Sequence, residues 1–143
     1  MKETDENKIA EQLRIVISRL IKVLKYQTKN DEQLSMTESS TLGLIYNHSE
    51  ILPSELATKE KVTAQSMSQI INKLLMLGFI KKTASKTDKR KVTITITANG
   101  KKNIEKRRSE KQEWLTQSIV KKTSKKEKEV LVNAIKVLSK LIE

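Results

Sequence analysis

The sequence of 143 residues contains no cysteine, which excludes disulfide bonds, thiolate metal sites and thiol-based redox sensing. It has one histidine, no glycine-rich loop that could cradle a phosphate, and no pair of acidic residues arranged for a cleft. These absences leave no set of side chains that could serve as nucleophile, general base and oxyanion donor. We therefore expect a protein that is not an enzyme and that has no cofactor and no metal site.

Long hydrophobic runs are also missing. The longest, such as residues 74–80, fall far short of a membrane span, and the N-terminal MKETDENK is acidic where a secretory signal would be basic and then apolar. A cytoplasmic protein without a membrane partner is the expectation. An amphipathic helix over residues 98–122 touching anionic lipid is an alternative, but few bulky apolar residues support it, and liposome co-sedimentation would test it.

Basic residues are abundant and unevenly placed. The formal net charge is +12, and it is concentrated in residues 81–91, with six basic residues and one acidic, and in residues 101–128, with eleven basic and four acidic. Charge gathered in this way is typical of a surface that binds a polyanion, nucleic acid before membrane, although lysine-rich faces are often only solvated.

The spacing of apolar residues predicts a mostly helical chain. One apolar stripe runs through a first helix from Glu6 to about Thr28, which Asn30-Asp31 interrupts, and another runs through a last helix capped by Ser124 and Glu127. Both stripes are wide for a single packing partner. Because only 36% of residues are hydrophobic and 3% aromatic, helices that share a core across a dimer would ease the shortage.

The middle of the chain predicts a helix-turn-helix followed by a hairpin. A second helix starting at Thr37 carries Leu42, Ile45 and Tyr46 toward the core, and a short third helix starts at Pro53. A fourth helix runs from a Thr63 cap to Leu77, with Gly78 as its C-terminal cap. Two strands follow, and in the second Val92, Ile94 and Ile96 alternate with Thr93, Thr95 and Thr97, the period of a half-buried strand. Thr97 can then cap a long fifth helix reaching about Val120.

The fourth helix has a polar side without an acidic residue, as major-groove reading requires, since base edges are read by donors and acceptors. The candidates for base contacts are Gln65, Ser66, Ser68 and Gln69, at the start of the helix that Thr63 caps, whereas Lys73 is better placed to hold a phosphate. An ordinary solvated helix face is the alternative.

The turn between the strands is strongly cationic, with Lys86, Lys89, Arg90 and Lys91 around a single acid, Asp88. Arg90 is expected to enter a minor groove, where narrow A·T-rich segments favour arginine. Asp88 can hold its guanidinium by paired hydrogen bonds and fix its direction. The alternative is a surface ion pair without a role in binding.

These segments resemble the MarR family of bacterial transcriptional regulators. The likeness lies in LSMTESSTLGLIY, in PSELATKEKVTAQSMSQIINKLLMLGFIKK, in the wing SKTDKRKVTITIT with its Asp88-Lys89-Arg90, and in the following TANGKK. SarA-like regulators share the lysine-rich winged helix, so the subfamily stays open. The lack of cysteine excludes the peroxide-sensing branch.

The resemblance implies a single MarR-type domain over residues 1–143. In it a winged helix-turn-helix DNA-binding unit, residues 34–97, is flanked by helical dimerisation regions, 1–30 and 98–143. It also implies a homodimeric repressor on double-stranded, pseudopalindromic DNA, released by a small anionic or phenolic effector. Tyr46 and His48 are candidate walls of an effector pocket, although a core tyrosine and an exposed histidine are the more ordinary interpretation.

A second function remains open from the residues alone. An architectural protein could coat nucleic acid without sequence preference, using the basic segment of residues 101–128. Its binding would depend steeply on salt and discriminate little between sequences. The uncharged polar face of the fourth helix argues against it, because a purely electrostatic binder would carry more lysine or arginine there.

Overall fold

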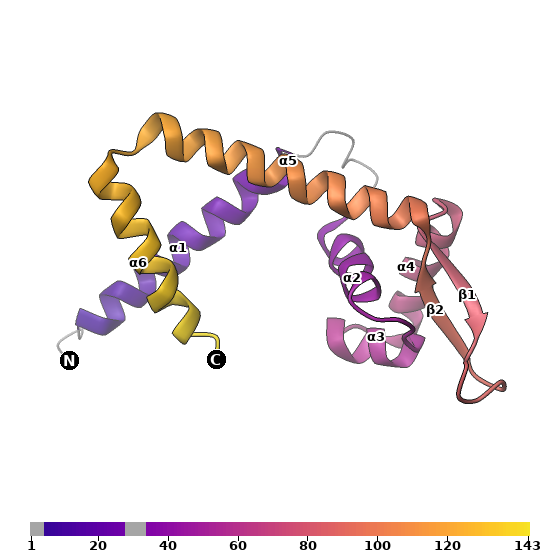
Figure 1. The fold of residues 1–143 in the computed structure, drawn as a ribbon. Coiled ribbons are helices and arrows are strands. Elements are labelled where there is room, and N and C mark those ends of the chain that lie inside the picture. Colours follow the sequence, from indigo (N-terminus) through magenta and orange to yellow (C-terminus); the bar gives the residue numbers. More distant parts are fainter. Residues whose placement is uncertain (1–4, 28–33) are drawn as a thin grey trace. The chain divides into compact units, whose positions relative to one another are not determined.

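The computed structural model describes residues 5–27 and 34–143 (Figure 1). Over these ranges the chain is mostly helical, with one antiparallel hairpin, as the sequence predicts. The elements in chain order are α1 (Asp5–Lys25), α2 (Met36–Tyr46), α3 (Pro53–Glu60), α4 (Ala64–Met76), β1 (Ile80–Ala84), β2 (Val92–Ile96), α5 (Ala98–Lys122) and α6 (Lys125–Lys140). No helix in the described ranges is both long enough and apolar enough to cross a membrane.

The described chain divides into two compact units, one of residues 34–108 and the other of residues 5–27 and 109–143. The core lies in the first unit, where α2, α3 and α4 pack together and against the hairpin. Its most deeply buried apolar side chains are Leu42, Ile45, Ile51, Leu56, Met67, Leu74 and Ile94. The predicted core residues of the second helix, Leu42 and Ile45, are therefore confirmed, and Tyr46 packs at the edge of the core.

Local capping signals fix the ends of these helices. The predicted start of the second helix at Thr37 is wrong by one residue: α2 begins at Met36, and its cap is Ser35. The Ser35 hydroxyl accepts from the N–H of Glu38, and the Glu38 carboxylate accepts from the N–H of Ser35, so the two satisfy each other's backbone donors. The Thr63 cap is confirmed by its bond from the N–H of Ser66.

Strands β1 and β2 pair from Ile80 with Ile96 to Ala84 with Val92. Ile51 adds an isolated antiparallel bridge to β2, since its N–H and carbonyl both bond to Ile94, at 3.1 and 2.8 Å. The predicted alternation of β2 holds only in part. Val92, expected on the buried side, is 50% exposed because it lies in the outermost pair, whereas Thr93 is buried under polar neighbours from two other segments.

The turn from the hairpin into α5 depends on Thr97 and Gly100. The Thr97 hydroxyl donates to the carbonyl of Gly78 at 2.6 Å and accepts from the N–H of Gly100, which confirms Thr97 as the cap. A Cβ on Gly100 would overlap the carbonyl oxygen of Phe79 and lie 2.7 Å from Cγ1 of Ile96. Glycine is therefore required for this close approach of helix and strand.

The other unit contains α1, α6 and the end of α5, and neither α1 nor α6 has a buried residue. The predicted cap of the last helix, Ser124 with Glu127, is confirmed. The first helix ends at Lys25, so Thr28 and the break at Asn30-Asp31 lie outside the described residues. Apolar side chains exposed on α1 and α6 include Ile9, Val16, Ile21, Val130, Val132, Ile135 and Val137.

Candidate DNA-binding interface

Helix α4 presents the polar face that the sequence predicts. Its N-terminal turns hold exposed hydroxyl and amide side chains, while Met67, Ile71 and Leu74 on the opposite side are buried in the core. The exposed candidates are Thr63, Gln65, Ser66, Ser68 and Gln69. Because α4 contains no acidic residue, this face offers donors and acceptors without charge repulsion toward a polyanion.

Lys73, further along α4, is held by a partner. Its Nζ donates to Oε1 of Glu38 at 2.8 Å, and the lysine side chain is 42% exposed. Burial of the Glu38 carboxylate opposes its ionisation, but bonds from Lys73 and from the Ser35 backbone outweigh this effect and lower the pKa of Glu38 below its ordinary value. Phosphate binding by Lys73, which stays a prediction, would therefore have to share or replace this ion pair.

The turn between β1 and β2, residues 85–91, forms the cationic wing. Lys86, Lys89, Arg90 and Lys91 are exposed, and the Arg90 side chain is 92% exposed. The predicted paired hydrogen bonds between Asp88 and the guanidinium are absent. Instead a single oxygen, Oδ1 of Asp88, accepts from the backbone N–H of Arg90 at 3.1 Å and from its Nε–H at 3.3 Å. Asp88 thus holds Arg90 through its backbone and Nε, and not through the terminal nitrogens of the guanidinium.

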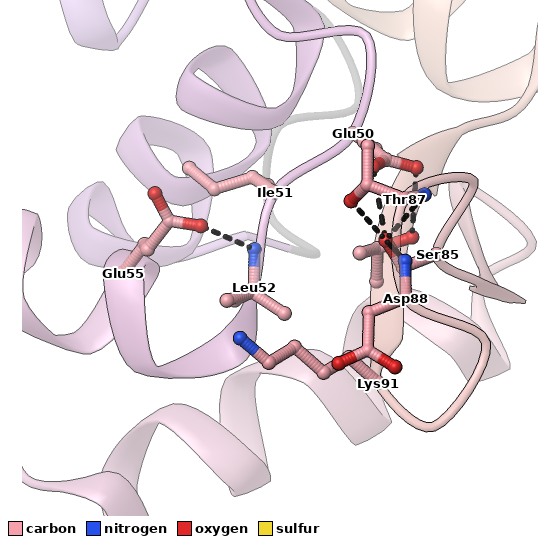
Figure 2. Close-up of a pocket in the computed structure, with 9 residues that line it drawn as sticks. Glu50, Ile51, Leu52, Glu55, Ser85, Thr87, Asp88 and Lys91 are labelled. Carbon is pink, nitrogen blue, oxygen red and sulfur yellow. Dashed lines mark hydrogen bonds between the residues drawn. The ribbon is translucent and has the colours of Figure 1, made fainter.

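A polar cluster at the base of the wing escaped the sequence analysis (Figure 2). The Ser85 hydroxyl, in a residue only 5% exposed, donates to Oε1 of Glu50 at 3.3 Å, and the hydroxyl of Thr93 lies 3.4 Å from Oε2 of the same carboxylate. These groups border a hollow of about 170 Å³, also lined by Glu55, Asp88 and Lys91. The sequence does not indicate this cluster, because Glu50 lies 35 residues before Ser85 and 43 residues before Thr93.

Tyr46 and His48, the predicted walls of an effector pocket, have other contacts. The Tyr46 hydroxyl donates to Oε1 of Glu105 at 3.3 Å, and the Arg108 guanidinium lies 4.9 Å from the centre of its ring. Nδ1 of His48 is 2.6 Å from the carbonyl oxygen of Leu44. The two hollows at the wing, of about 170 and 470 Å³, are lined by other residues. The effector pocket stays a prediction.

Known proteins share this arrangement of helices and wing. Residues 34–92, which run from just before α2 to the first residue of β2, match the model of the MarR family. This part of the chain, which holds α2, α3, α4 and the wing, is similar to the MarR family. A curated relative, an uncharacterized HTH-type transcriptional regulator of Mycobacterium leprae, is 26% identical over 136 residues, which are 95% of this chain and 94% of the relative.

Solved structures share the fold over nearly the whole chain. A candidate transcriptional regulator of Pseudomonas aeruginosa superposes with a TM-score of 0.88 at 22% identity, covering 99% of both chains. FabT of Streptococcus pneumoniae, solved in complex with DNA, superposes with a TM-score of 0.68 at 19% identity, covering 96% of this chain and 97% of FabT. At these identities the likeness shows the fold alone, a winged helix-turn-helix unit with flanking helices.

Proposed function

We propose that this chain is a transcriptional regulator of the MarR type, which binds double-stranded DNA as a homodimer and represses transcription at a pseudopalindromic operator. The observation that carries the proposal is the pairing, within one compact unit, of an acid-free helix face exposing amides and hydroxyls with a wing tipped by a 92% exposed arginine. A groove reader needs both, because base edges are read by donors and acceptors and the backbone by cations. Such a regulator would work in the cytoplasm.

The residues divide into three roles under this proposal. The exposed side chains of the first turns of α4 read base edges in the major groove, and they are Gln65, Ser66, Ser68 and Gln69. Thr63 caps the helix and leaves its N-terminal amides near the DNA backbone. Arg90 enters the adjacent minor groove, with Lys86, Lys89 and Lys91 near phosphates and Asp88 orienting the turn.

The homodimer is supported by the apolar faces of α1 and α6. Ile9, Val16, Val130 and Ile135 are each more than half exposed, and a monomer would leave this surface in water. We assign residues 34–97 to the DNA-binding unit and residues 1–30 and 98–143 to dimerisation. A two-fold dimer would present two α4 helices about 34 Å apart, one turn of DNA. A monodisperse monomer at micromolar concentration would contradict the assignment.

Relief by a small anionic or phenolic effector is a further part of the proposal, with Tyr46 and His48 as candidate contacts. The effector would have to bind a DNA-incompetent arrangement more tightly than the competent one. Tyr46 supports the idea through its position, since it joins α2 to Glu105 and Arg108 in α5. A panel of phenolic carboxylates that leaves operator binding unchanged would remove this part.

The deciding experiment compares binding of the full chain to its own upstream promoter DNA and to scrambled DNA of the same length and composition. At about 0.15 M salt nonspecific attraction is weak, and a specific regulator should prefer the promoter by about 1,000-fold or more. Equal affinities would call for genome-wide selection of bound fragments. If that selection also yielded no motif, sequence-specific regulation would be refuted.

One observation favours a second candidate function, an architectural DNA-coating protein. Residues 101–128 carry eleven basic and four acidic residues, and Lys101, Lys102 and Lys106 at the start of α5 are exposed. Binding through this segment alone would show no sequence preference and a slope of about −0.9 in log affinity against log salt for each phosphate neutralised. The promoter comparison separates the two candidates.

A further inference from the structure

The polar cluster at the base of the wing has one residue at its centre. Glu50 directly precedes Ile51, which bonds through both backbone groups to Ile94 of β2. The backbone of residue 50 is therefore anchored to the hairpin by its neighbour. Its carboxylate reaches both strands' ends, with Oε1 accepting from Ser85, just after β1, and Oε2 lying 3.4 Å from the Thr93 hydroxyl in β2.

From Ser85 the hydrogen bonds continue into the wing. The Ser85 hydroxyl gives its one proton to Glu50 and accepts from the backbone N–H groups of Thr87 and Asp88, each at 3.3 Å. Asp88 in turn accepts from the backbone and Nε of Arg90. Glu50 is thus linked to the arginine at the tip through Ser85 and Asp88, and Figure 2 shows the first part of this chain.

The charge of this carboxylate is favourable beside the lysines of the wing but unfavourable toward DNA. A negative charge beside a cationic wing repels the phosphates that the wing is proposed to meet, and replacing it by a neutral residue should strengthen nonspecific binding. Ser85 and Thr93 are 5% and 3% exposed, so their hydroxyls need a partner inside the protein. The two oxygens of Glu50 reach both hydroxyls, and the Thr93 hydroxyl also lies 3.2 Å from the Thr83 hydroxyl and 3.3 Å from the Thr83 carbonyl oxygen.

We propose that Glu50 is a positioning residue for DNA recognition, which holds the base of the wing through Ser85 and Thr93 and thereby fixes the direction of Arg90. The expected effect of Glu50 on DNA binding rests on the proposed function, whereas its effect on the structure of the wing does not. It assigns specificity to a residue outside both α4 and the wing. Removing Glu50 should reduce selective binding even though it removes a repulsive charge.

The test uses three variants of the full chain. Glu50→Ala removes the acceptor and the charge, whereas Glu50→Gln removes the charge and keeps one acceptor oxygen. Glu55→Gln is the matched control: Glu55 lines the same hollow, and its Oε1 accepts from the N–H of Leu52 and not from the wing, a bond that glutamine retains. Hydrogen exchange of the Thr87 and Asp88 amides is measured in the free protein, and affinity is measured for operator and scrambled DNA.

We expect Glu50→Ala to speed exchange at Thr87 and Asp88 and to weaken operator binding by about tenfold, with unchanged or tighter binding to scrambled DNA. Glu50→Gln should recover part of the loss, and Glu55→Gln should not lose operator affinity. In a protein that already carries Arg90→Ala, adding Glu50→Ala should weaken operator binding by less than about twofold, because both changes remove the same oriented arginine.

Other outcomes overturn the inference. Unchanged exchange at Thr87 and Asp88 would mean that Glu50 does not support the turn, and equal losses for operator and scrambled DNA would indicate general destabilisation. If the double variant lost operator affinity by the product of the two single losses, Glu50 and Arg90 would act independently, and Glu50 would not act through Arg90. If the unaltered protein does not distinguish operator from scrambled DNA, the proposed function fails, and the exchange measurement still decides whether Glu50 holds the wing.

Discussion

Replacing Glu38 tests how α2 and α4 are joined beside the proposed reading face. One oxygen of Glu38 accepts both from the N–H of Ser35, at 2.7 Å, and from Nζ of Lys73, at 2.8 Å. Glu38→Ala loses half of a capping box, about 1 kcal/mol, and an ion pair worth about 0–1 kcal/mol because Lys73 is partly solvated. The free energy of unfolding should fall by about 1–2 kcal/mol in total. Glu38→Gln keeps an acceptor for Ser35 and should lose less than about 1 kcal/mol.

The free energy of unfolding that is lost in the Glu38 variants should decrease as the pH falls. The pKa of Glu38 is lowered in the folded protein, so the unfolded chain binds a proton more readily at this site. The stabilisation is therefore fully present above the unfolded pKa, near about 4.3, and disappears as the pH falls through the folded value. Urea unfolding at about pH 7 and about pH 3 measures it. The difference between the unaltered chain and Glu38→Gln should shrink on acidification, and an equal difference at both pH values would refute the reasoning.

Three further changes probe the interface, the fold and the assembly. Arg90→Ala should weaken operator binding by about 1–3 kcal/mol in a fluorescence titration, and an unchanged affinity would exclude the minor-groove role. Gly100→Ala should lower the free energy of unfolding by about 1–3 kcal/mol through overlap with the Phe79 carbonyl. Gly43→Ala, whose Cβ meets nothing within 4 Å, should instead raise it by about 0.5–1 kcal/mol, and equal effects would contradict the steric argument. Ile135→Glu should shift the protein toward monomer in sedimentation velocity, whereas an unaltered dimer would move the interface off α6.

The parts of the fold that the sequence predicts are those with local causes. Thr63 and Thr97 each bond to a backbone amide three residues on, so their spacing alone identifies helix starts. The start of α2 carried the same kind of signal in Ser35 and Glu38, a serine followed three residues later by a glutamate. This capping box places the start of α2 at Met36, one residue before the predicted start at Thr37.

The parts that the sequence does not predict depend on distant segments. A period of two in β2 indicates one buried face, and it cannot show that Glu50, 43 residues earlier, covers Thr93 on the other face. The same limit applies to Asp88 and Arg90. Their spacing indicates contact, but the geometry of a seven-residue turn directs one oxygen to both the backbone and Nε. For the candidate site, residue types and exposure were therefore predictable, whereas the support beneath the wing was not.

The exposed apolar surface of α1 and α6 limits the free energy of association of a dimer built on these helices. In the described residues, seven large apolar side chains of α1 and six of α6 are at least 37% exposed. Covering the exposed part of each would contribute about 1 kcal/mol, since complete burial of such a side chain is worth about 1.5–3 kcal/mol. The sum, about 13 kcal/mol if all were covered, is of the same order as the 4–15 kcal/mol cost of association. A dimer built on these helices therefore needs most of the face covered, and one buried charge at Ile135 should be enough to tip the balance toward monomer.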